Sequence, residues 1–204
     1  MFALVDKSDN SITKTLSGSQ GITLDGIQHP KAIFSLWTEA ERNAINIYTV
    51  EINNSKRKNT EWYVNTNVTY SFNGSKVTGS YGDATARAHA DTLFTAQDES
   101  DGKGTEGDVK DEGLKTKLIR SIKSQAEGEL NKTDWYITRK AEKDTAIPSA
   151  VSTHRDAVRS KQAEMETAIT NASDTPALET LYTYTTQEDG STTRPLGELP
   201  TKDF

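Results

Sequence analysis

The stretch from Leu114 to Ala172 constrains the fold most, because its apolar residues recur at helical spacing. In its first part an apolar side chain stands at every fourth position, which predicts one apolar stripe along a helix. The positions are Leu114, Leu118, Ile122, Ala126 and Leu130. Thr133-Asp134 interrupts this pattern, and Thr133 is expected to cap a short following helix that ends at Asp144-Thr145.

A second long helix is predicted after Pro148, since proline is favoured in the first turn of a helix. Its apolar residues repeat at intervals close to seven and four, as in a coiled coil. They are Val151, Val158, Met165 and Ile169. This seam can pair with the first helix as an antiparallel hairpin, or with a copy of itself or a partner protein. The sequence leaves both pairings open.

The chain before this stretch is expected to be a small α+β region. Phe2–Val5 and Ile12–Leu16 suit two strands, and Ile47–Ile52 alternates like a third. Between them, Thr38 and Glu41 form the pattern of a capping box at the start of a short helix.

A hairpin is predicted further along, where Asn73-Gly74 separates the alternating run Glu61–Phe72 from Lys76-Val77-Thr78. A type I′ turn needs positive φ at both central residues, and Asn-Gly satisfies that need. The alanine-rich segment Asp83–Gln97 predicts a helix.

Residues 98–113 are acidic and rich in glycine, which favours a flexible linker. A calcium loop starting at Asp98 would need glycine at its sixth position, where Lys103 stands, so its register fails. The predicted organisation is therefore an N-terminal α+β domain (1–97), an acidic linker (98–113), a helical hairpin domain (114–183) and a polar tail (184–204). Leu196, Leu199 and Phe204 in that tail are apolar and could dock on a neighbour.

Composition excludes several classes of function. The chain has 204 residues, no cysteine and a net charge of −6, so we expect neither thiol chemistry nor binding to nucleic acid. We expect no signal peptide at the N-terminus and no membrane span. His29, His89 and His154 lie far apart in the sequence, and no phosphate-binding, nucleophile or metal motif is present. We therefore expect no enzyme activity, no catalytic residue, no metal and no cofactor.

The C-terminal block resembles short proteins from the tail modules of tailed bacteriophages, which are described as tail assembly chaperones or tail-fibre assembly proteins. Three segments carry the resemblance: Leu130–Tyr136 with its Thr-Asp-Trp, then Arg139 with Ile147-Pro148, and Arg155–Arg159 with the form Arg-x-x-Val-Arg. The resemblance covers about the region 114–172. It implies a structural component of the virion, in the tail or at the fibre attachment, that is made in the cytoplasm of the bacterial host.

The resemblance also implies that other tail or fibre proteins are the partners, with self-association as a further expectation. The alternative is an assembly chaperone that is absent from the mature particle. The residues expected at the partner-binding or hairpin-packing site are Asp134, Trp135, Arg139, Arg155, Val158, Arg159 and Met165.

Two roles are open for this motif. As a scaffold, Trp135 would pack in the crook between the helices, Asp134 would help to cap the turn, and the arginines would pair with Asp134 or Glu142. In the other role, Trp135, Arg155 and Arg159 form a docking surface.

Overall fold

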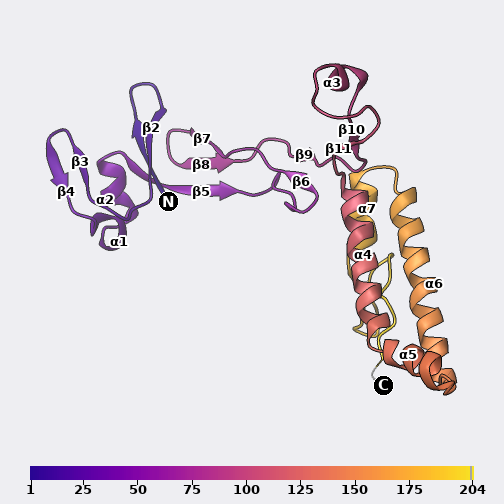
Figure 1. The fold of residues 1–204 in the computed structure, drawn as a ribbon. Coiled ribbons are helices and arrows are strands. Elements are labelled where there is room, and N and C mark those ends of the chain that lie inside the picture. Colours follow the sequence, from indigo (N-terminus) through magenta and orange to yellow (C-terminus); the bar gives the residue numbers. More distant parts are fainter. Residues whose placement is uncertain (203) are drawn as a thin grey trace. The chain divides into compact units, whose positions relative to one another are not determined.

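The computed structural model describes residues 1–202 and 204 (Figure 1). The chain forms two compact units, Met1–Thr85 and Ala86–Phe204. The first unit is rich in strands and the second is built mainly from helices, so the α+β class predicted from the sequence is confirmed.

A five-stranded sheet forms the core of the first unit, with the strand order β2-β1-β5-β8-β7. Its strands are β1 (Phe2–Asp6), β2 (Ser11–Leu16), β5 (Ile47–Asn53), β7 (Thr69–Phe72) and β8 (Val77–Ser80). Neighbouring strands are antiparallel except for β5 and β8, which are parallel. The buried core consists of Ala3, Val5, Tyr48, Val50 and Val77. These residues alternate along their strands, so one face of the sheet is apolar.

The same part of the chain contains several short elements. They are β3 (Ile22–Leu24), β4 (Ile27–His29), α1 (Ile33–Leu36), α2 (Glu39–Ala44), β6 (Tyr63–Val64) and β9 (Thr85–Ala86). The predicted capping box of α2 is confirmed: the Thr38 side chain accepts the backbone N–H of Glu41, and the Glu41 carboxylate accepts the N–H of Thr38. Asn46, which has a positive φ of 62°, stands between α2 and β5.

The β7–β8 hairpin confirms the turn predicted at Asn73-Gly74, although the turn type differs. Phe72 pairs with Val77, and the Asn73 N–H donates to the Lys76 carbonyl, so Gly74 and Ser75 are the central residues. Of the loop residues only Gly74 has positive φ, at 92°. The predicted type I′ turn is therefore wrong, because Asn73 lies one position too early to be a central residue.

The helix predicted for Asp83–Gln97 is wrong. In its place the chain forms β9, an extended segment, β10 (Thr92–Leu93) and the start of α3 (Ala96–Ser100), and β11 (Val109–Asp111) returns to pair with β10. Residues 98–113, expected to be a flexible linker, thus contain most of α3 and all of β11. Together β10, α3 and β11 form one structured loop, which we call the β10–α3–β11 excursion.

Tertiary contacts override the helix propensity of the alanines in this segment. The carbonyls of Ala88 and His89 accept the N–H groups of Leu114 and Lys115, and the Asp91 carboxylate accepts the N–H of Gly113. These are the free N–H groups of the first turn of α4, and an extended segment can reach them where a helix could not. A Cβ on residue 113 would lie 2.3 Å from the Ala90 carbonyl carbon, so this contact requires glycine.

The second unit is a helical hairpin with additions. Its elements are α4 (Leu114–Asn131), α5 (Asp134–Lys143), α6 (Ser149–Asn171), α7 (Thr175–Tyr182), β12 (Thr185–Thr186) and β13 (Thr192–Thr193). The helices α4 and α6 run antiparallel side by side (Figure 1). The Lys115 ammonium, near the start of α4, donates to the carbonyl of Thr170 near the end of α6. Of the two pairings that the sequence leaves open for the α6 seam, the antiparallel hairpin with α4 is the one present within the chain.

The predicted apolar seam of α6 is confirmed. Val151, Val158, Met165 and Ile169 are each no more than 1% exposed. Ile122 and Ala126 of α4 and Leu178 of α7 are buried as well. No helix in the described part of the chain is long and apolar enough to cross a membrane.

The segment predicted to be a polar tail (184–204) has described residues that contact the helical unit. Leu196 is 2% exposed, and its N–H donates to the carbonyl of Leu181. The Arg194 guanidinium stacks on Tyr182 and Tyr184, and the Phe204 ring lies 5.1 Å from the His154 ring. Leu196 and Phe204 therefore contact the chain's own helical unit, where the sequence suggested a neighbour.

Leu196→Ala is expected to lower the free energy of unfolding of the helical unit by about 2–4 kcal/mol, because it leaves a cavity at a buried site. Denaturant unfolding followed by the helical circular dichroism signal measures this change. Leu199→Ala is the matched control, because Leu199 is only half-buried and should cost much less. Equal effects of the two substitutions would contradict the anchoring role of Leu196.

Candidate protein-binding site

A buried arginine organises the turn between α4 and α5. Arg155, on α6, is 8% exposed, and its Nη1 lies 2.7 Å from three oxygens. These are the carbonyl of Leu130, the hydroxyl of Thr133 and a carboxylate oxygen of Asp134. Arg155 thus contacts the end of α4 and the start of α5 at the same time. We call this cluster of four residues the Arg155 joint.

The joint adds a cation to the end of α4, where the Leu130 carbonyl already accepts the N–H of Thr133 at 3.1 Å. Leu130 is in the last turn of α4, where carbonyls have no partner within the helix and the helix dipole favours a cation. Thr133 is fully buried, and its hydroxyl donates to the same Leu130 carbonyl. The guanidinium supplies both the charge and the hydrogen bonds that this position needs.

The predicted pairing of Arg155 with Asp134 is confirmed, at 2.7 Å. The predicted capping of the short helix by Thr133 is wrong: Thr133 is at the N-cap position of α5, but its side chain accepts no helix N–H. Its hydroxyl is engaged with Leu130 and Arg155 instead. The Asp134 carboxylate likewise accepts from Arg155 rather than capping the turn.

Trp135 is not packed in the crook of the helices, as the scaffold role required. Its side chain is 52% exposed, and the buried position between α4, α5 and α6 holds Thr133 and the Arg155 guanidinium. The Trp135 ring lies against Tyr136 with centroids 3.8 Å apart. The Arg139 guanidinium lies over both rings, 4.6 Å from the Trp135 centroid and 5.3 Å from that of Tyr136.

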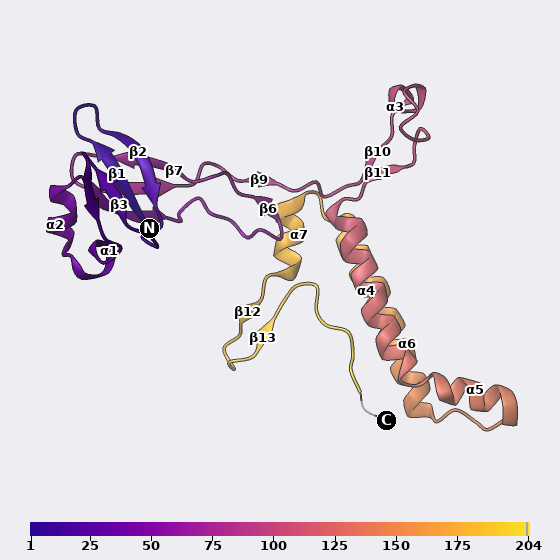
Figure 2. The same cartoon turned by 60° about the vertical axis from the view of Figure 1, so that its left-hand side comes forward.

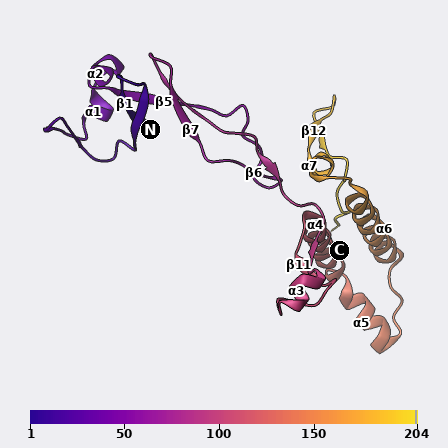
Figure 3. The ribbon, with the colours of Figure 1, turned by 90° about the horizontal axis from the view of Figure 1, so that it is seen from above.

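This aromatic group belongs to a helix that buries none of its own residues. In two views α5 extends away from the ends of α4 and α6 (Figure 2, Figure 3). Ile137, on the same helix, is 41% exposed. We call Trp135, Tyr136 and Arg139 the α5 surface. The Arg155 joint fixes the first turn of α5, and so it also sets where this surface stands on the hairpin.

The remaining predicted site residues are placed elsewhere. Val158 and Met165 are buried in the hairpin core, so they pack the helices and contribute no outer surface. Arg159 is half exposed and pairs with Asp156 at 3.4 Å, not with Asp134 or Glu142 as expected. The structure therefore brings Asp134 and Arg155 together, groups Trp135 with Arg139, and separates Arg159 from both.

Arg159 instead borders a groove of about 680 Å³ along α6. The lining residues are Leu130, Arg159, Gln162, Ala163, Glu166, Thr167, Thr170 and Asn171. Sequence reasoning missed this groove because it searched for apolar seams. The signal that marks it is a row of small side chains, Ala163, Thr167 and Thr170, at helical spacing.

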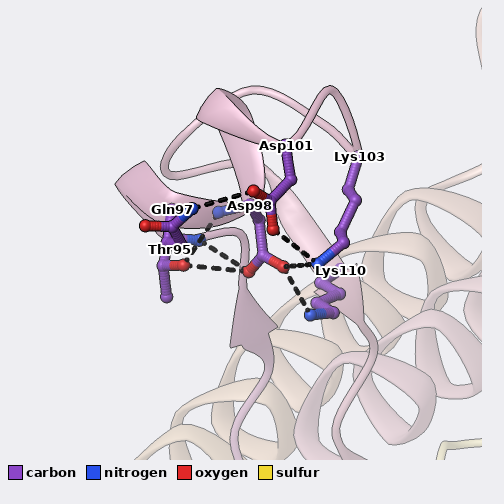
Figure 4. Close-up of polar contacts among 6 residues, drawn as sticks. All are labelled: Thr95, Gln97, Asp98, Asp101, Lys103 and Lys110. Carbon is purple, nitrogen blue, oxygen red and sulfur yellow. Dashed lines mark hydrogen bonds and ion pairs between the residues drawn. The ribbon is translucent and has the colours of Figure 1, made fainter.

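A separate polar cluster stabilises the excursion formed by β10, α3 and β11 (Figure 4). The Asp98 carboxylate accepts the N–H and hydroxyl of Thr95 and also pairs with Lys110 at 3.1 Å and Lys103 at 3.8 Å. The Thr95 backbone N–H and the neighbouring Lys110 lower the pKa of Asp98 to about 2. The Asp98 carboxylate is thus paired with two lysines of its own loop. No group of three metal-ligating side chains occurs among residues 1–202 and 204.

Comparison of the chain with family models, with curated proteins and with solved structures found no match.

Arg155→Ala is expected to lower the free energy of unfolding of the helical unit by about 2–3 kcal/mol, because it removes three hydrogen bonds and the packing of a buried side chain. Arg159→Ala is the control on the same helix, because the Arg159 side chain is 52% exposed and its ion pair is long. Denaturant unfolding compares the two. A loss for Arg155→Ala no larger than that for Arg159→Ala would show that the joint does not hold the turn.

The Asp98 cluster predicts an acid-sensitive loop. Because folding lowers the pKa of Asp98 from 3.8 to about 2, the cluster contributes stability above pH 3.8 that is lost as the pH falls toward 2. Backbone amide signals of Gly102 and Gly107, followed by NMR during acid titration, should shift in that window. Asp98→Asn should abolish this transition, whereas Asp108→Asn, an exposed site on the same loop, should leave it in place. An unchanged transition in Asp98→Asn would assign it to another group.

Proposed function

We propose that this protein is a non-enzymatic structural component of a tailed-bacteriophage virion, in the tail or at the fibre attachment. It would bind neighbouring virion proteins through the α5 surface of its helical unit. The observation that carries the proposal is the exposure of Trp135 within the motif that resembles phage tail-module proteins. Trp135 makes none of the hydrogen bonds of the Arg155 joint. We therefore attribute the large exposed ring at this position to a contact with another protein.

The composition of the α5 surface supports a protein partner. Tryptophan, tyrosine and arginine are the residues that most often dominate the binding energy of protein interfaces. Here one of each lies within two turns of helix, and Arg139 holds both rings in one arrangement. A surface whose side chains are already ordered loses less entropy on binding.

The anchoring of α5 also fits a docking role. The helix has no buried residue of its own, and it depends on Thr133, Asp134 and Arg155 at its first turn. A short helix with so little burial is marginal in isolation. A partner that covers its exposed rings would stabilise it.

The test is mass spectrometry on purified particles of the source phage, with the gene product supplied as wild type or as Trp135→Ala. The wild-type protein is expected in the particles at a fixed ratio to the tail proteins. Trp135→Ala should reduce its recovery by about tenfold or more, the effect of removing an interface hot spot. Leu36→Ala is the control, because Leu36 is an apolar side chain that is 78% exposed in the other unit.

Absence from the particles would contradict the proposal. If the protein were absent from particles but abundant in infected cells and bound to a tail protein there, the assembly chaperone would be the correct function. Normal recovery of Trp135→Ala in particles would leave a virion component whose contact lies outside the α5 surface.

A further inference from the structure

The two faces of the α4–α6 hairpin differ in what covers them. On one face the C-terminal segment crosses α4, where Glu198, Leu199 and Thr201 border the same hollow as Gln125 and Lys132. Its last residue, Phe204, then lies against His154 of α6, as described above. This face is therefore occupied by the chain itself.

The other face carries the groove along α6, and its side chains are available. Arg159, Ala163, Thr167 and Thr170 are exposed, at spacings of four, four and three residues that place them on one side of the helix. Three of these four are small, so a second helix could approach closely. Leu130 forms the apolar wall on the α4 side.

The charges of the groove are self-complementary. Arg159 and Glu166 stand equally far from the Gln162–Ala163 peptide bond, on opposite sides of it. They are seven residues apart, which is about two helical turns, so they lie on the same side of α6. A second α6 that runs antiparallel across this point places Arg159 of each copy opposite Glu166 of the other. One two-fold axis then forms two identical ion pairs.

We propose that the open face of the α4–α6 hairpin binds a second copy of this chain, antiparallel about an axis at Gln162–Ala163. The existing contacts leave room for the new pairs. Among residues 1–202 and 204, Arg159 forms one ion pair, the 3.4 Å contact with Asp156, and its side chain is 52% exposed. The Glu166 carboxylate accepts from Gln162 through Oε1 and lies 3.5 Å from Lys123 through Oε2, so each oxygen can accept a further hydrogen bond.

The charges that line the groove favour some binding partners over others. A partner with an acidic helix would be repelled by Glu166, and a basic one by Arg159 and Lys123. A helix that carries one positive and one negative residue two turns apart, in the reverse order, can pair with both Arg159 and Glu166. A second α6 that runs antiparallel to the first has this arrangement. Since the groove is largely polar, we expect a weak dimer that weakens further as salt screens the ion pairs.

The test is sedimentation velocity on the purified full chain over a concentration series, at low and at high salt. Wild type should show a monomer–dimer equilibrium. Arg159→Glu and Glu166→Arg should each weaken it by about tenfold or more, because each places like charges opposite one another. The double variant restores opposite charges at both contacts, so its dimerisation should return close to the wild-type level. Lys14→Glu, an exposed site in the first unit, has the same charge change as Arg159→Glu and should have no effect.

Cross-linking gives a second measurement that does not depend on the charge variants. Because the natural chain has no cysteine, Ala163→Cys introduces a single thiol close to the proposed axis. Oxidation should yield a covalent dimer from Ala163→Cys and little from Thr138→Cys on α5. Circular dichroism of every variant establishes that it is folded.

Three results would overturn the proposal. The first is a wild-type chain that stays monomeric at all concentrations and forms no Ala163→Cys dimer. The second is a dimer that none of the charge variants weakens, and the third is a double variant that remains as weak as the single ones. Since the measurement uses the isolated chain, it is independent of the virion test: a failed dimer leaves the α5 surface untouched, and a protein absent from virions can still dimerise.

Discussion

The helical unit depends on one buried cation at the point where the chain reverses. Arg155 lies on α6, yet it holds the last turn of α4 and the first turn of α5 through Leu130, Thr133 and Asp134. A buried guanidinium is costly to dehydrate, and only several well-placed oxygens offset that cost. The apolar seam brings the helices together but is not directional. The hydrogen bonds of the joint specify where α4 stops and where α5 begins.

Sequence reasoning located the regular elements because they depend on local pattern. The four-residue spacing in α4, the seam of α6, the capping box at Thr38 and the hairpin after Phe72 are all properties of a few neighbouring residues. The sequence pattern misplaces the Thr133 side chain, and of the two roles open for Trp135 the packed one is not found. Threonine is a good cap by type, but here its hydroxyl is engaged by a guanidinium from a residue some twenty positions later.

The alanine-rich segment before α4 also differs from its predicted structure because of contacts with residues distant in the sequence. Its composition favours a helix, yet Ala88, His89 and Asp91 are used as acceptors for the first turn of α4. The groove on α6 was missed for the opposite reason, since no single residue in it is unusual. Its significance comes from the spacing of small and charged side chains relative to a neighbouring helix.

The contact of Asp91 with Gly113 and Thr116 also closes the base of the β10–α3–β11 excursion. Asp91 and Gly113 lie at the two ends of the loop and are tied by a hydrogen bond, so the rest of the loop adds length without setting the position of α4. Gly102 has positive φ at the end of α3, with open space where a side chain would be. Such a tip accepts inserted sequence without disturbing the fold. It is therefore a natural place for an epitope or fluorescent domain that reports on the helical unit without occupying any of its surfaces.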